Sequence, residues 1–308
     1  MTIHTEAWVL FLVGVAVLLI LDLGIFRKRE HQPSLKEAAI WSLVWISAAL
    51  LFDSFIYFWQ GHDAAVIFLT AYLLEKSLSL DNLFVFVMIF NFFAVSPKLQ
   101  HRVLHWGIIS AIVLRFLLIT AGLHLVQKFD WILYIAGLFL VYSSVVLFRH
   151  QDNQTEPSGL KMLDFLKKKI PMLPDNPQGH FFRRQQKRWF VTPLFLVLVS
   201  IEFSDLVFAL DSIPAVFAIT LDPFMVFTSN IFAILGLRSL YFLLADLLPR
   251  FYYLKPALSI ILGFVGIKML IGHYVNISNV FSLGFIAVIL SGALIMSWMR
   301  TKQLNKNI

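Results

Sequence analysis

Cysteine is absent from this chain of 308 residues, and charged residues make up only 14% of it. Without cysteine there is no disulfide, no thiolate ligand for a metal ion and no cysteine nucleophile. The sequence also lacks a glycine-rich phosphate loop, a nucleotide-binding signature and a nucleophile triad. We therefore expect a protein that is not an enzyme, holds no resident cofactor and does not itself hydrolyse ATP.

Apolar residues make up 59% of the chain, and its charged fraction is well below the roughly 25% of an ordinary globular domain. The charges are also segregated, so that the runs 7–21 and 277–299 contain none. Runs of this length approach the ~20 residues that a membrane-spanning helix needs. The composition predicts an all-α polytopic bundle embedded in a lipid bilayer.

Hydropathy predicts about nine transmembrane helices, at 7–26, 38–60, 64–94, 103–125, 129–148, 191–219, 223–247, 254–272 and 278–298. Short loops that carry Lys and Arg lie on the cytoplasmic side, which tests this count. The odd-numbered connections and the tail hold 20 of the 25 basic residues, whereas the N-terminus and the even-numbered connections hold only Lys128. This asymmetry predicts an N-terminus outside and a C-terminus in the cytoplasm. It also explains the net charge of +7 without a nucleic-acid partner.

Three regions follow from this map. We expect an N-terminal membrane half at 1–148, a basic cytoplasmic loop at 149–190, and a C-terminal membrane half at 191–308 that ends in a short cytoplasmic tail. Within the loop, Leu163, Leu166 and Ile170 have helical spacing beside several lysines. That pattern fits a short helix on anionic lipid, and a solvated linker fits it equally well.

The two membrane halves share a sequence pattern. Asp81 in the third span and Asp205 in the sixth are each followed three residues later by Phe and then a small residue, and Arg115 corresponds to Arg238 at nearly the same offset of 123 to 124 residues. A second register pairs Glu75 and Asp81 with Asp205 and Asp211. Because three crossings separate the third span from the sixth, the first register predicts an inverted repeat, an arrangement common in secondary transporters.

Five acidic residues fall inside predicted spans: Glu75, Asp81, Glu202, Asp205 and Asp211. A charged side chain at a helix centre costs roughly 2.5–3.5 kcal/mol on insertion scales, so their presence indicates a functional site. The alternative is that basic residues within the spans neutralise them as structural ion pairs. The four candidate charge partners are Lys76, Arg115, Arg238 and Lys268.

Carboxylates with amide and hydroxyl oxygens form a ligand set that suits Mg²⁺, Ca²⁺ or Mn²⁺. Further candidate ligands or path residues are Asn82, Ser212, Asn230 and Asp22. Six polar side chains in the stretch 75–82, and Pro214 just after Asp211, mark two places where we expect a helix to unwind. Such a bend would be needed for Glu202, Asp205 and Asp211 to converge, because a regular helix directs Asp211 some 120° away from Asp205.

Long motifs support a family resemblance: EKSLSLDNLFVF at 75–86, EFSDLVFALDSIPA at 202–215 and SNIFAILGLR at 229–238. With these, the chain resembles the TerC family of bacterial inner-membrane proteins, nearest to its Alx-like branch, over almost its whole length. The resemblance implies membership of the LysE-type transporter superfamily. It also implies manganese export with the five buried acids as essential residues. One departure is Val146, where Alx-like members can carry a lysine that mirrors Lys268.

The favoured hypothesis is export of Mn²⁺ from the cytoplasm, with protons as the coupling ion. Two alternatives stay open from the sequence. In the first, the protein transports nothing and is a membrane partner in a stress-resistance or secretion-associated complex of the tellurium-resistance type. In the second, it exports an organic cation. The sequence identifies no protein partner.

Overall fold

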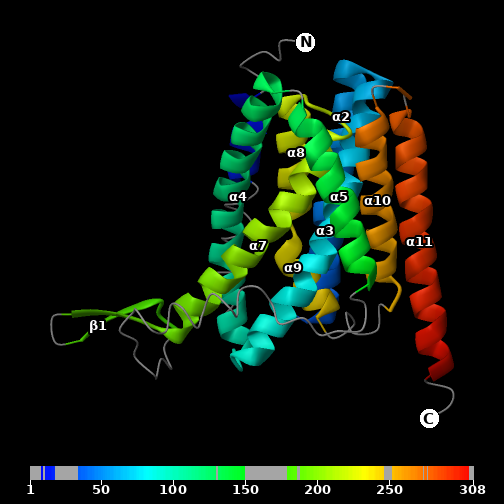
Figure 1. Ribbon diagram of the computed structural model, residues 1–308. Coiled ribbons are helices and arrows are strands. Elements are labelled where there is room, and N and C mark those ends of the chain that lie inside the picture. The colour runs from blue at the N-terminus through cyan, green and yellow to red at the C-terminus, as the bar shows by residue number, and fades with distance from the viewer. Residues whose placement is uncertain are drawn as a thin grey trace.

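The computed structural model describes residues 8–9, 11–17, 34–129, 131–149, 179–185, 188–245, 252–272, 274–275 and 277–304. These residues form a bundle of long helices, as predicted, together with one small hairpin (Figure 1). The helices are α2 (Leu35–Gln60), α3 (His62–Phe92), α4 (Pro97–Lys128), α5 (Trp131–Arg149), α7 (Pro193–Phe217), α8 (Pro223–Ile234), α9 (Leu237–Leu244), α10 (Leu254–Ile271) and α11 (Asn279–Leu304); the strands are β1 (Phe182–Gln185) and β2 (Arg188–Val191).

Seven helical segments in the described residues are long and apolar enough to cross a membrane, with α8 and α9 counted as one interrupted span. Helix α3 has 31 residues, a length of about 46 Å, but carries Glu75, Lys76 and Asp81 in its interior. Of the first predicted span, 7–26, the structure describes 8–9 and 11–17, which are helical. The predicted class, an all-α polytopic membrane bundle, is confirmed.

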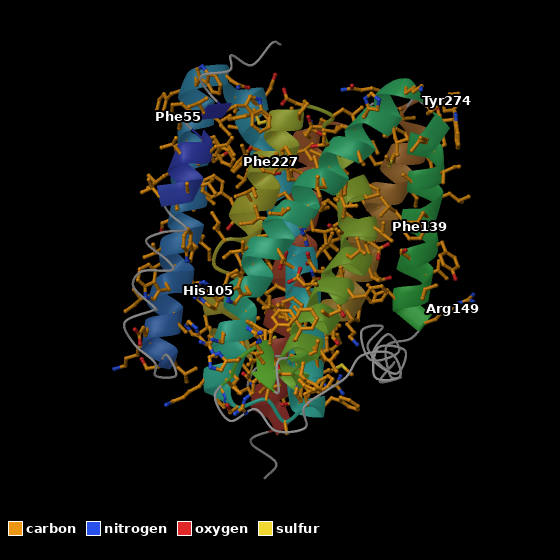
Figure 2. The ribbon with its side chains drawn as sticks, turned by 90° about the vertical axis from the view of Figure 1, so that its left-hand side faces the viewer. Phe55, His105, Phe139, Arg149, Phe227 and Tyr274 are labelled. Carbon is orange, nitrogen blue, oxygen red and sulfur yellow. The ribbon has the colours of Figure 1, made fainter. Side chains whose placement is uncertain are left out.

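The outside of the bundle is aromatic and apolar. Phe55, Phe139 and Tyr274 are 48%, 40% and 84% exposed, and their side chains lie at the edges of the molecule (Figure 2). In water such a surface would be unfavourable, whereas in a bilayer it meets hydrocarbon.

Helix-capping residues and prolines in the sequence mark the positions where several of these helices begin. Proline occupies the first turn of α4, α7 and α8, where its missing amide hydrogen costs nothing. The side chain of Ser34 accepts a hydrogen bond from the Glu37 amide at 3.2 Å, and Asp222 likewise caps α8. Gly61, with φ +94°, makes the tight turn between α2 and α3.

The antiparallel hairpin of β1 and β2 was not predicted. It extends away from the bundle at the N-terminal end of α7 (Figure 1). Thr192 fixes its base, because the Thr192 hydroxyl donates to the His180 carbonyl at 2.7 Å. The predicted surface helix around Leu163 to Ile170 lies outside the described residues.

Helices α5 and α10 pack very closely (Figure 1). A Cβ on Gly266 would lie 2.9 Å from the Gly137 carbonyl oxygen. Farther along, the Ser144 hydroxyl donates to the Ser259 carbonyl at 2.8 Å, and the Ser259 hydroxyl donates to the Ser144 carbonyl at 2.7 Å. Small residues thus let the two backbones approach and exchange hydrogen bonds, as is usual between membrane helices.

The two predicted unwound segments are wrong. Helix α3 is continuous through 75–82, and α7 continues through Pro214 to Phe217. The span breaks instead at Leu235 and Gly236, between α8 and α9. Gly236 has φ +82°, and a Cβ there would lie 2.7 Å from Trp45. Three polar side chains of this stretch contact residues outside α3: Glu75 contacts Arg115, Lys76 contacts the Ala233 carbonyl, and Asn82 contacts Asp205. The Ser77 hydroxyl instead donates to the Leu73 carbonyl of α3 itself.

Candidate functional site

Arg115 of α4 is the centre of a buried ionic cluster and is only 1% exposed. Its Nη1 donates to the Glu75 carboxylate of α3 and, at 3.2 Å, to Asn230 Oδ1 of α8. Its Nε and Nη2 reach the two carboxylate oxygens of Asp205 in α7 at 3.3 and 3.1 Å. This is the forked geometry that only a guanidinium provides. One cation therefore joins four helices and faces two carboxylates.

Asn82 of α3 completes the coordination of Asp205. Its Nδ2 donates to Asp205 Oδ1 at 3.2 Å across 123 positions of sequence. The contact joins the predicted third and sixth spans, and the inverted repeat stays a prediction.

Glu202 lines a small cavity on one face of α7. The cavity has a volume of about 20 Å³, room for roughly one water molecule, and Asp205 and Arg238 also line it. Glu202 Oε1 is buried and has no hydrogen-bond partner among the described atoms. Gly107 of α4 gives this carboxylate its space, because a Cβ there would lie 3.3 Å from Oε1.

Asp211 lines a larger cavity of about 200 Å³, bordered also by Asn82, Tyr142 and Ser143. The Ser143 hydroxyl donates to Asp211 Oδ1 at 2.9 Å. Glu202 and Asp211 are nine residues apart on an unbroken helix and so project about 180° from each other. The expected convergence of Glu202, Asp205 and Asp211 does not occur, because α7 does not unwind and Asp211 lines a different cavity from the other two.

Two of the four candidate charge partners contact oxygens other than carboxylates in the part of the chain that is described. The Lys76 ammonium donates to the Ala233 carbonyl at 3.1 Å, with the Leu235 carbonyl at 3.4 Å. Lys268 is 8% exposed and donates to Asn279 Oδ1 and Ser282 Oγ, each at 2.9 Å. Of the predicted acids, Glu75 and Asp205 therefore form the ion pairs that the alternative interpretation expected, and both pair with Arg115.

The remaining predicted residues are placed as follows. Ser212 is buried, and its hydroxyl has no hydrogen-bond partner among the described atoms. Asp81 lies within α3 with its side chain outside the described atoms, and Asp22 lies outside the described residues. Across the described part of the chain, no three acidic or histidine side chains are grouped closely enough to hold a metal ion. The metal site stays a prediction.

Sequence reasoning missed Ser143 and Gly107. Ser143 and Ser144 stand out as adjacent hydroxyls in an apolar span, which is a weak signal for a contact with a buried acid. Gly107 gives no sequence signal of its role, since its importance comes only from the side chain that faces it.

Comparisons with known proteins agree with this architecture. Residues 60–305 match the family model described as integral membrane protein TerC family. The chain is 43% identical over 295 residues to "Uncharacterized membrane protein STKORF319" of Myxococcus xanthus, covering 96% of this chain and 92% of that protein. It is 44% identical over 292 residues to "Putative membrane-bound redox modulator Alx" of Escherichia coli strain K12, covering 92% and 91%. The Salmonella typhi protein of that name is 42% identical over 310 residues, covering 98% and 96%. No solved structure matches. A helical bundle with buried acids and a match across most of its length make this chain a member of the TerC family of integral membrane proteins.

Proposed function

We propose that this protein exports a divalent metal ion, Mn²⁺ in the first place, from the cytoplasm across the bacterial inner membrane in exchange for protons. The observation that carries the proposal is a charge imbalance inside the bundle. Within the predicted spans, the five acids carry five formal negative charges and the four basic residues, Lys76, Arg115, Arg238 and Lys268, carry four positive ones. Lys76 and Lys268 contact oxygens that do not belong to carboxylates, so fewer cations lie beside the acids than their charge requires. A divalent cation or protons would supply the difference.

Unpartnered carboxylate oxygens add to this support. Glu75 Oε2 and Glu202 Oε1 are buried without a hydrogen-bond partner among the described atoms. A buried polar atom in this condition costs about 1–3 kcal/mol, more when charged, and calls for a missing partner such as an ion or water. Hard divalent cations bind such oxygens.

Arg115 gives the proposal a mechanism. Its guanidinium takes the place between Glu75 and Asp205 where a cation bound to both would lie. For a metal ion to bind there, Arg115 must withdraw, and when the metal leaves, Arg115 or protons must replace its charge. The same carboxylates therefore hold metal and protons in turn.

Energetics favours proton coupling. Moving two positive charges outward against an inside-negative potential costs ~4.6 kcal/mol per 100 mV. Inward proton flow down the same potential can supply this free energy. Mn²⁺ is preferred over other hard cations here because the sequence motifs resemble those of manganese-exporting TerC proteins.

The test is ⁵⁴Mn²⁺ flux in proteoliposomes with and without a pH gradient. We expect flux that depends on the gradient in the wild type and at least tenfold less in Glu202→Gln and Asp211→Asn. Asp63→Asn is the matched control, because the Asp63 side chain is fully exposed at the start of α3. Unchanged flux in folded Glu202→Gln and Asp211→Asn would falsify the proposal.

The name of the Alx relatives points to a redox role for those proteins. In this chain the absence of cysteine excludes thiol–disulfide exchange as the basis of such a role. No feature of the buried cluster favours it over ion transport.

A further inference from the structure

The break between α8 and α9 exposes main-chain oxygens inside the bundle. Helix α8 ends at Ile234, Leu235 turns out of the helix, and Gly236 adopts the left-handed conformation before α9 begins. Carbonyl oxygens near such a break lose their usual amide partners four residues along the chain. Each must find another donor or a cation.

Lys76 supplies that cation. Its Nζ lies 3.1 Å from the Ala233 carbonyl oxygen and 3.4 Å from that of Leu235, which are the oxygens flanking the end of α8. The side chain comes from α3, one residue after Glu75, and the two point about 100° apart. Glu75 therefore turns to Arg115, while Lys76 turns away from the acids and toward the break.

Unwound carbonyls and the C-terminal ends of half-helices are the groups that coordinate monovalent cations in membrane transporters. A lysine ammonium is a compact point charge with similar demands on surrounding oxygens. The partial negative charge at the end of α8 strengthens the attraction. Geometry and electrostatics at this point thus match those of a cation site.

We infer that the α8–α9 break is a second cation site, made of main-chain carbonyls and separate from the carboxylates, and that the Lys76 ammonium fills it in place of a monovalent alkali cation. The tethered charge holds α3 to the break and keeps Na⁺ and K⁺ out. Removing the ammonium opens the site to those ions.

The experiment measures the thermal unfolding midpoint of the purified full chain in detergent, in choline, sodium and potassium chloride at equal ionic strength. Lys76→Met removes the ammonium and keeps an unbranched side chain. We expect its Tm to be lowered in choline and to rise by about 2–4 °C, saturably, with Na⁺ or K⁺. The wild type should not respond.

Lys268→Met is the matched control, because Lys268 is another lysine within a span but is held by side-chain oxygens of Asn279 and Ser282. It should not respond to alkali cations. Two results overturn the inference: a folded Lys76→Met protein with the same Tm in all three salts, or one that folds in none of them while Lys76→Arg folds. In the second case a cation from solution fails to replace the tethered one. Manganese is not used in this measurement, so a result that overturns the alkali-cation site is distinguishable from one that overturns the exporter proposal.

Discussion

The Asn82 side chain of α3 donates a hydrogen bond to Asp205 of α7 at 3.2 Å. The contact joins α3 to α7 and lies between the two cavities, since Asn82 lines one and Asp205 the other. The pair therefore links α3 to α7 and places one residue at each cavity.

Asn82→Leu should destabilise the protein. The substitution keeps the number and branching of the side-chain heavy atoms, although leucine is larger, and it removes a hydrogen bond to a charged group, worth about 1.5–3 kcal/mol. We expect a lower thermal unfolding midpoint in detergent. Asn91→Leu, an exposed position on the same helix, should leave it almost unchanged. Equal midpoints for both variants would contradict a structural role for the pair.

Arg115→Met should be more severe. Breaking a buried ion pair leaves an uncompensated charge and costs about 3–5 kcal/mol, and here two carboxylates lose their cation. We expect little folded protein by size-exclusion chromatography. Arg115→Lys should not restore it fully, because an ammonium cannot fork between Glu75 and Asp205.

Adding Glu75→Gln and Asp205→Asn to Arg115→Met should recover much of the folded yield, because the buried charges then disappear together. If the triple variant folds no better than Arg115→Met alone, the arginine acts through packing and not through charge.

Gly236→Ala should distort the break between α8 and α9. The left-handed conformation costs a non-glycine residue about 1–2 kcal/mol, and the new Cβ would lie 2.7 Å from Trp45. Trp45→Ala should relieve the contact, so the double variant should lose less stability than the sum of the single losses, as a double-mutant cycle in thermal unfolding measures. Gly292→Ala in α11, where a Cβ meets open space, is the control.

Gly266→Ala tests the close packing of α5 on α10. The added methyl would lie 2.9 Å from both the Gly137 carbonyl oxygen and Val141, so the helices must separate, at a cost of about 1–3 kcal/mol. Gly284→Ala has free space around it and should leave the unfolding midpoint unchanged or higher. A stable Gly266→Ala protein would show that the interface tolerates separation.

The predicted orientation can be checked directly because the natural chain has no cysteine. Lys98 and Lys128 are exposed at opposite ends of α4, which at 32 residues is about 48 Å long. With an impermeant thiol reagent added to intact cells, Lys128→Cys should be labelled and Lys98→Cys only after permeabilisation. The reverse pattern would invert the topology.

Much of the fold could be predicted because bilayer crossing leaves a strong record in hydropathy and in the placement of Lys and Arg. The span expected at 191–219 corresponds to Pro193–Phe217, and that at 223–247 contains α8 and α9. The position of the break could not be predicted in the same way. The polar stretch 75–82 suggested unwinding, but α3 is continuous there, whereas the span at 223–247 breaks at Gly236.

The site was harder to predict than the spans. Helical spacing alone directs Glu202 and Asp211 to opposite faces of α7, and the convergence expected for them depended on an unwound segment, whereas α7 is continuous. The partner of Lys76 could not be predicted either, because every residue has a main-chain carbonyl and the sequence does not mark which of them will be free to accept a hydrogen bond. Arg115 could be identified as a charge partner, but its choice of Glu75 and Asp205 depends on how four helices pack.

Because α7 is continuous, it presents Glu202 to one cavity and Asp211 to another on opposite sides of a single helix. A rotation of α7 about its axis would turn both carboxylates through the same angle. The two cavities are thus geometrically coupled through one helix.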